Sequence, residues 1–155
     1  MKIIIVDNDE TDRRAISRCL ASIGETDVVE VASGRECLER LAEEKFELMM
    51  LDFYLDDCEG LDLVDKMKAI GVSLPIVVVT GLGDEFLRNK LRTFGIDDYI
   101  TKDKLCPKLL KVTARLAVEN HKRRALTGEL MVRIKADLEK LGQSLDAKLA
   151  EFNDK

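Results

Sequence analysis

The fold is decided by residues 3–10, which read IIIVDNDE, four apolar residues that end at a cluster of acidic and amide side chains. Three further short apolar runs end at a polar residue in the same way, at Asp52, Thr80 and Lys102. Short apolar runs bounded by polar residues are typical of buried strands in a parallel sheet. Because ligands bind at the carboxyl ends of the strands in an open α/β sheet, we expect these polar side chains to surround one site.

Strand and helix patterns alternate five times along residues 1–121. We predict strands at about residues 2–6, 27–31, 47–51, 75–79 and 97–101. We predict helices at about residues 10–22, 34–44, 59–70, 84–94 and 105–121. This alternation indicates an α/β fold in which helices cover both faces of a parallel sheet.

Residues 122–155 have no strand signal and form a second predicted region. Their apolar residues recur three or four positions apart, over about three heptads from Met131 to Phe152. The pattern predicts a helix over about residues 124–152 with an apolar stripe that has to be buried. Two interpretations are open: the helix folds back on the first region, or it associates with a partner or a second copy.

Length and composition describe a soluble protein. The chain has 155 residues, of which 46% are hydrophobic and 35% charged, with a formal net charge of −5. No apolar run approaches the roughly 18 residues that a membrane span needs. No signal peptide pattern follows Met1, so we expect a cytoplasmic protein with no membrane contact.

The residues that several common kinds of catalytic or binding site need are scarce in this chain. The four cysteines lack Cys-x-x-Cys spacing, and the single histidine, His121, cannot supply a His-based catalytic or zinc site. The basic side chains of residues 102–155 are spread among acidic ones without a recognition motif, so we expect no nucleic-acid binding.

The polar residues at the strand ends do point to a chemistry. Carboxylates that meet at one edge of a sheet repel one another unless a cation lies among them. Asp7, Asn8 and Asp52 offer the hard oxygen ligands that Mg²⁺ prefers, and Thr80 and Lys102 add a hydroxyl and an ammonium group. The combination predicts a Mg²⁺-assisted phosphoryl site.

Four motifs resemble those of receiver domains, the phospho-accepting domains of two-component response regulators. They are the turn VDNDE at residues 6–10, the loop LDFYLDDCEG at residues 51–60, and the strands PIVVVTG at residues 75–81 and GIDDYITK at residues 95–102. The resemblance implies a flavodoxin-like, doubly wound sheet with strand order 2-1-3-4-5. It also implies a signalling phosphoprotein rather than an enzyme, with a receiver domain at residues 1–121 and a helical extension at residues 122–155.

The resemblance assigns a role to the acidic residues. Asp52 would be the phosphoacceptor, a nucleophile that takes a phosphoryl group from a phosphohistidine or a small phosphodonor. Asp7, Asn8 and the backbone carbonyl of Tyr54 would hold Mg²⁺ together with Asp52. Because Asn8 stands where the family usually has a second acid, we predict weaker Mg²⁺ binding than in a site with two acids.

The remaining site residues would bind the phosphoryl group and transmit the signal. Lys102 would pair with Asp52 before transfer and with a phosphoryl oxygen afterwards, and Thr80 would hydrogen-bond to another oxygen. Movement of Thr80 would let Tyr99 rotate inward and change the face formed by residues 84–94, 97–101 and 105–121. Tyr54 and Leu82 would flank the phosphoryl group and hinder an attacking water, which predicts a long-lived phosphorylated state.

The partners follow from the same resemblance. The phosphodonor would be a sensor histidine kinase or a phosphotransfer protein, and no output domain is recognisable. The output would be a protein contact, made by the face named above or by the C-terminal helix, with a homodimer through residues 124–152 as one form. Phosphorylation would alter how this helix packs or pairs.

Two other functions fit part of the sequence. A degenerate receiver would use the same fold as a binding module without phosphorylation. A haloacid-dehalogenase-type phosphatase would use Asp7 as nucleophile and Asp9 as general acid and base, in the pattern Asp-x-Asp-x-Thr that ends at Thr11. The second alternative leaves Asp52 without a role. The acceptor, Asp52 or Asp7, distinguishes a receiver from such a phosphatase.

Overall fold

The computed structural model describes residues 1–81, 83, 85–96 and 98–153. It divides into two compact units, Met1–Asn120 and His121–Lys155. The first unit holds the sheet and the residues that the sequence places around a common site. The second unit consists of helix.

Five parallel strands form one sheet, in the order β2-β1-β3-β4-β5. The strands are β1 (Ile3–Val6), β2 (Val28–Val31), β3 (Leu48–Leu51), β4 (Ile76–Thr80) and β5 (Tyr99–Thr101). The predicted α/β class, strand order and flavodoxin-like topology are thereby confirmed. Val6 lies opposite Leu51 and Thr80 lies opposite Thr101 in the strand register. This register brings the residues that follow these strands to the same edge of the sheet.

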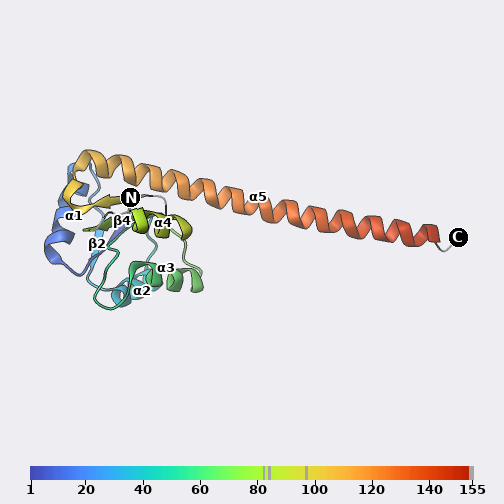
Figure 1. Cartoon of the computed structure of the whole chain (residues 1–155), viewed down its shortest axis with the longest axis horizontal. Coiled ribbons are helices and arrows are strands. Elements are labelled where there is room, and N and C mark those ends of the chain that lie inside the picture. The colour runs from blue at the N-terminus through green and yellow to red at the C-terminus, as the bar shows by residue number, and fades with distance from the viewer. Residues whose placement is uncertain (82, 84, 97, 154–155) are drawn as a thin grey trace. The chain divides into compact units, whose positions relative to one another are not determined.

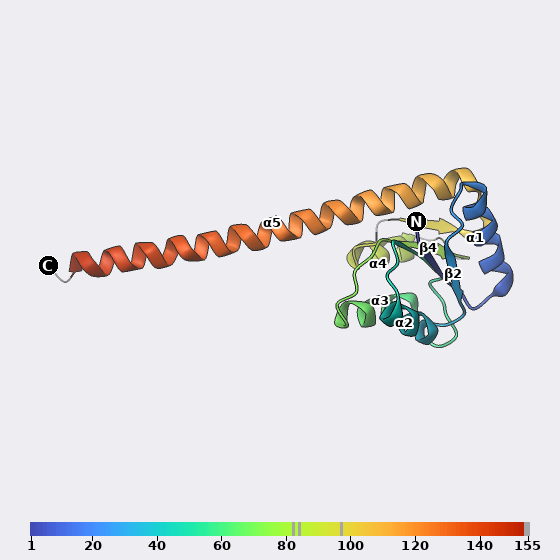
Figure 2. The same ribbon diagram turned by 180° about the vertical axis from the view of Figure 1, so that it is seen from behind.

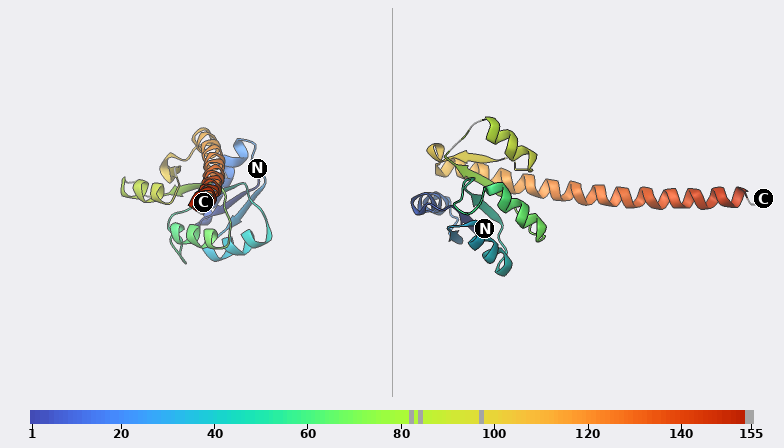
Figure 3. Two further views of the ribbon diagram at one scale, coloured as in Figure 1. Left: turned by 90° about the vertical axis from the view of Figure 1, so that its right-hand side faces the viewer. Right: turned by 60° about the horizontal axis from the view of Figure 1, so that its bottom comes forward.

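The helices cover both faces of the sheet, as Figures 1 and 2 show for the first unit. They are α1 (Glu10–Ser22), α2 (Gly34–Glu43), α3 (Gly60–Ala69), α4 (Glu85–Thr93) and α5 (Pro107–Asn153). The first unit's part of α5 packs with α1 on one face, and α2, α3 and α4 pack on the other. Figure 3 shows the same layers from two further directions.

One boundary differs from the prediction. The helices expected at residues 105–121 and 124–152 are a single element, α5, because the intervening residues Lys122 and Arg123 are good helix formers. The helix begins at Pro107, where the missing N–H has no helical partner to lose. A short 3-10 helix, η1 (Lys102–Lys104), precedes it and was not expected from the sequence.

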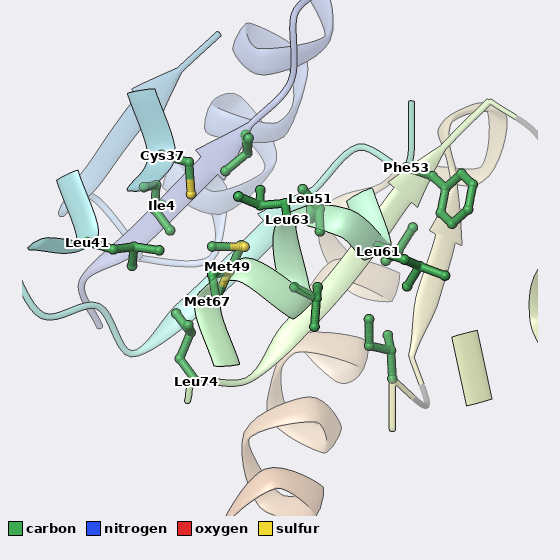
Figure 4. Packing of buried hydrophobic residues seen from close by; sticks show 14 of the residues in the cluster. Ile4, Cys37, Leu41, Met49, Leu51, Phe53, Leu61, Leu63, Met67 and Leu74 are labelled. Atoms are coloured by element: carbon green, nitrogen blue, oxygen red, sulfur yellow. The ribbon is translucent and has the colours of Figure 1, made fainter. Parts of the chain in front are cut away.

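The core explains why the strands are apolar on both sides. Alternate residues of β1 enter different clusters: Ile4 and Val6 pack under α2 and α3, whereas Ile3 and Ile5 pack under α1 and α5. Figure 4 shows the first cluster, where Cys37 of α2 and Met67 of α3 lie against the sheet. This rigid double layer fixes the positions of the strand ends.

Candidate functional site

Three side chains from separate strand ends meet through one ammonium group. The Nζ atom of Lys102 lies 2.9 Å from Asp7 Oδ2 and 3.0 Å from Asp52 Oδ2. Asp7 directly follows β1, Asp52 directly follows β3, and Lys102 directly follows β5. The structure therefore brings together the three charged residues that the sequence placed at this site.

Lys102 has a third carboxylate partner that the sequence did not indicate. Its Nζ atom lies 2.6 Å from Oδ2 of Asp12, in the first turn of α1. Asp9 caps this helix, because its side chain accepts a hydrogen bond from the backbone N–H of Asp12. The cap orders the turn that presents Asp12 to the lysine. The acidity of this turn was the available signal in the sequence, but it equally suits a helix N-terminus.

Burial sets the electrostatics of the group. Only 1% of the Asp7 side chain and 9% of the Asp52 side chain are exposed. Burial raises the pKa of Asp7 above its ordinary value, against the opposing effect of Lys102. Burial also lowers the pKa of Lys102, but its close contacts with the carboxylates of Asp12, Asp7 and Asp52 outweigh this effect, and the net pKa is raised. The lysine is therefore charged at neutral pH.

The donor set fits a hard divalent cation. Asp7 Oδ2 is buried and, within the described residues, has an ion pair to Lys102 but no aligned hydrogen bond. No cluster of three or more His, Cys, Asp or Glu side chains suited to a metal occurs in the described ranges. A Mg²⁺ ion here would therefore need amide, backbone or water oxygens beside the two carboxylates, which is a ligand set that Mg²⁺ accepts.

The other two predicted ligands belong to the loop after Asp52 or are hydrogen-bonded to it. Asn8 is exposed, and its amide N–H donates to Asp56 Oδ1 at 3.0 Å, so its amide oxygen is the atom left for a cation. The backbone N–H of Tyr54 donates to Asp52 Oδ1 at 3.3 Å, which orients the carboxylate. Asp56 thus links the loop after β3 to the turn after β1.

The loop after Asp52 is closed on itself and anchored to α2. The N–H of Gly60 donates to the Phe53 carbonyl at 2.7 Å, and a Cβ at Gly60 would lie 3.1 Å from the Asp52 carbonyl oxygen. The close approach explains why glycine stands at this position. The Asp57 carboxylate accepts hydrogen bonds from the N–H groups of Gly34 and Arg35, each at 3.0 Å, which lowers the pKa of Asp57.

The two remaining predicted residues lie on neighbouring strands. Thr80 is fully buried at the end of β4, and Tyr99 begins β5. The Tyr99 hydroxyl accepts hydrogen bonds from Arg88 of α4 at 2.9 and 3.2 Å. Arg88 was not identified from the sequence, because nothing in its spacing marks it as a partner of Tyr99. Leu82, expected to flank the phosphoryl group, lies outside the described residues.

Comparison with known proteins shows the class to which this fold and site belong. The chain matches the family described as the response regulator receiver domain over residues 3–114. It is 32% identical over 114 residues to the chemotaxis protein CheY1 of Helicobacter pylori, covering 72% of this chain and 91% of that protein. A CheY homologue of Campylobacter jejuni has the same identity over 114 residues, covering 72% of this chain and 87% of that protein.

Solved structures agree with this result. The BeF3-activated receiver domain of Klebsiella pneumoniae RstA is 29% identical, with a TM-score of 0.68 over 76% of this chain and 98% of that one. A CheY-like receiver from Methanospirillum hungatei is 25% identical, with a TM-score of 0.67 over 79% of this chain and 96% of that one. The chain belongs to the response regulator receiver family, whose members are signalling proteins of two-component systems.

Membership of this family bears on the alternatives. Its partners include histidine kinases or phosphotransfer proteins, and the comparisons give no specific support to a phosphatase with Asp7 as nucleophile. Across the described part of the chain, no helix has the length and apolar character to cross a membrane.

Proposed function

We propose that Asp52 accepts a phosphoryl group, with Mg²⁺ as cofactor, and that the protein catalyses only its own phosphorylation and dephosphorylation. A carboxylate oxygen of Asp52 forms a bond to phosphorus as the bond from phosphorus to the donor nitrogen or oxygen breaks. The leaving group is a histidine side chain of a kinase or phosphotransfer protein, or the acid of a small acyl phosphate. The product is an aspartyl phosphate.

The residues around Asp52 have separate tasks in this step. Lys102 holds the acceptor carboxylate in place and then pairs with a phosphoryl oxygen. Thr80, the last residue of β4, binds another phosphoryl oxygen. Asp7, Asn8, Asp52 and the Tyr54 carbonyl would hold Mg²⁺. When bound, the cation would neutralise charge on the transferring oxygens.

A single observation carries this proposal: one lysine ammonium lies within 3.0 Å of two buried carboxylates that follow neighbouring strands. A structural ion pair requires one acid, and a second buried carboxylate adds repulsion and desolvation that folding does not need. Such an arrangement suits a site where a cation and a phosphoryl group are to be held.

The test is intact-mass measurement after incubation with acetyl phosphate and Mg²⁺. We expect a gain of one phosphoryl group in the wild type and none in Asp52→Ala. A gain in both proteins would place the nucleophile elsewhere, with Asp7 as the first candidate. A gain in neither, with acetyl phosphate and then with a phosphorylated kinase, would favour the degenerate receiver that only binds.

The output that we propose is a change in protein contacts. Release of Tyr99 from Arg88 would alter the face formed by α4, β5 and residues 107–120 of α5. This face, the C-terminal helix, or both would contact a downstream protein, and residues 124–152 can also form a homodimer. The support for a role of Tyr99 is that it belongs to β5 and is tied to Arg88 of α4 by hydrogen bonds that a rotation would break.

A further inference from the structure

The second unit is a helix that carries a row of exposed large apolar side chains. Every described residue after His121 is exposed. A helix with a continuous apolar face gains most of its stability by packing that face. Large apolar side chains that are 44–83% exposed form this face: Leu126, Leu130, Met131, Ile134, Leu138, Leu141, Leu145, Leu149 and Phe152.

Seven of these nine residues follow an eleven-residue repeat, and Leu126 and Met131 do not. Leu138 recurs as Leu149, Ile134 recurs as Leu145, and Leu130 recurs as Leu141 and again as Phe152. A seven-residue repeat also holds for Met131, Leu138, Leu145 and Phe152, but it is interrupted at Lys148, seven residues after Leu141. Eleven residues make three turns at about 3.67 residues per turn, so the stripe runs almost along the helix axis. The heptads expected from the sequence and the eleven-residue repeat share Leu138, Leu145 and Phe152.

The stripe is also symmetric about the point between Leu141 and Gly142. Leu138 and Leu145 lie equally far from this point along the chain, as do Ile134 and Leu149. Met131 and Phe152 form the outermost pair of the same kind. Turning the helix end for end superimposes these three pairs on themselves and places Leu141 at the position of Gly142. Two copies that run in opposite directions therefore present matching apolar layers at the three pairs.

Charged residues beside the stripe form two pairs of opposite charge that are nearly symmetric about the same point, since the midpoint of each pair lies one residue from it. Lys135 and Asp146 are eleven residues apart and lie on one flank, and Asp137 and Lys148 lie on the other. In an antiparallel pair each flank faces the same flank of the second copy. Each lysine then meets an aspartate of the second copy, on both sides of the seam.

Gly142 fits a close crossing at the centre. A Cβ atom at this position would meet nothing within 4 Å, and the residue has no positive φ angle. Glycine in a helix interior costs about 1 kcal/mol relative to alanine. The described part of the chain thus offers no reason for glycine here, whereas the approach of a second helix does.

We propose that residues 131–152 pair with the same residues of a second copy in an antiparallel two-fold arrangement. The apolar stripe forms the seam, and Lys135–Asp146 and Asp137–Lys148 pairs close its flanks. This inference specifies the homodimer proposed above and does not depend on phosphoryl transfer.

Sedimentation equilibrium of the full chain tests the stoichiometry and the seam. We expect a dimer that Leu138→Asp converts to monomer. Val132→Asp is the matched control, because Val132 is 71% exposed on the same helix but lies about 200° around the axis from Ile134. Helicity measured by circular dichroism identifies any variant that unfolds. A monomeric wild type, a trimer, or equal loss in both variants would overturn the proposal.

A charge exchange tests the direction of the helices. Lys135→Asp places two aspartates together in the antiparallel pair and should raise the dissociation constant about tenfold. Lys135→Asp combined with Asp146→Lys restores opposite charges and should recover the wild-type constant. In a parallel pair the carboxylate introduced at position 135 would instead lie near Asp137 of the second copy, so a double variant weaker than the single one would refute the antiparallel arrangement.

Discussion

Asp12 changes how the charge of the site is distributed. Asn8 lacks the charge that the family usually has in the turn after β1, but Asp12 supplies a carboxylate on the other side of Lys102. Three carboxylates and one ammonium leave two negative charges, which one divalent cation neutralises. Asp12 also gives Lys102 a carboxylate partner that is not one of the proposed Mg²⁺ ligands.

We therefore predict that Asp12→Asn lowers the affinity for Mg²⁺ by about three- to tenfold, because both the local charge and the lysine's alternative partner are lost. Isothermal titration calorimetry with Mg²⁺ measures the affinity directly. Glu10→Gln is the matched control: Glu10 lies in the same helical turn but pairs with exposed Arg14 at 2.6 Å. Equal affinity losses in the two variants would mean that Asp12 acts only through its negative charge and not through its contact with Lys102.

The sequence could not reveal this contact. Lys102 and Asp12 are 90 residues apart, and their meeting depends on the cap of α1 and on the turn of η1. By contrast, Asp7 and Asp52 were predictable, because each ends an apolar run and parallel strands share one carboxyl edge. The sequence predicts the position of a residue that follows a strand, because the strand register fixes it. It does not predict that Asp12 reaches Lys102, because that contact depends on how α1 is rotated about its axis.

Between elements, the Asp57 carboxylate joins the loop after β3 to the start of α2. Asp57→Ala removes two hydrogen bonds to the N-terminal N–H groups of α2 and should lower the free energy of unfolding by about 1 kcal/mol. Urea denaturation at neutral pH measures this loss. Lys66→Ala, a change on the neighbouring helix α3, serves as a control with no such bonds to lose.

The same contact predicts a pH dependence. The pKa of Asp57 is lowered in the folded protein by the Gly34 and Arg35 N–H groups. Its contribution is therefore complete above the ordinary pKa of 3.8 and is lost as the pH falls through the lowered value. The difference in unfolding free energy between wild type and Asp57→Ala should shrink below about pH 4. A difference that stayed constant down to about pH 2 would show that the carboxylate charge is not involved.

Across the whole molecule, one helix connects the core to the proposed dimer seam. Leu110, Ala114 and Ala117 of α5 are buried against the sheet, and the stripe lies further along the same helix. Phosphorylation adds almost two negative charges at Asp52 and should change the dimer dissociation constant, by about fivefold or more for typical coupled sites. Sedimentation with and without acetyl phosphate measures the change, and Asp52→Ala should show none. An unchanged constant would mean that the two units act independently.

The largest difference from the predicted elements is α5, which is one continuous helix where the sequence pattern predicts two. Its two halves have different patterns, since residues 107–120 bury one face against a sheet and the later residues carry a repeat suited to another helix. A change of pattern of this kind predicts a boundary between elements. Physically, a helix can continue while the surface that covers it changes, and Gly128 is compatible with both outcomes.

The aromatic composition gives the protein an optical property. It has no tryptophan and two tyrosines, so all of its intrinsic ultraviolet emission above that of phenylalanine comes from Tyr54 and Tyr99. Tyr54 is half exposed beside Asp52, and Tyr99 is held by the Arg88 guanidinium, 5.7 Å from the ring centre. The tyrosine fluorescence of the unmodified chain therefore reports on the surroundings of the proposed acceptor, through Tyr54, and on the contact with α4, through Tyr99. No attached dye is needed.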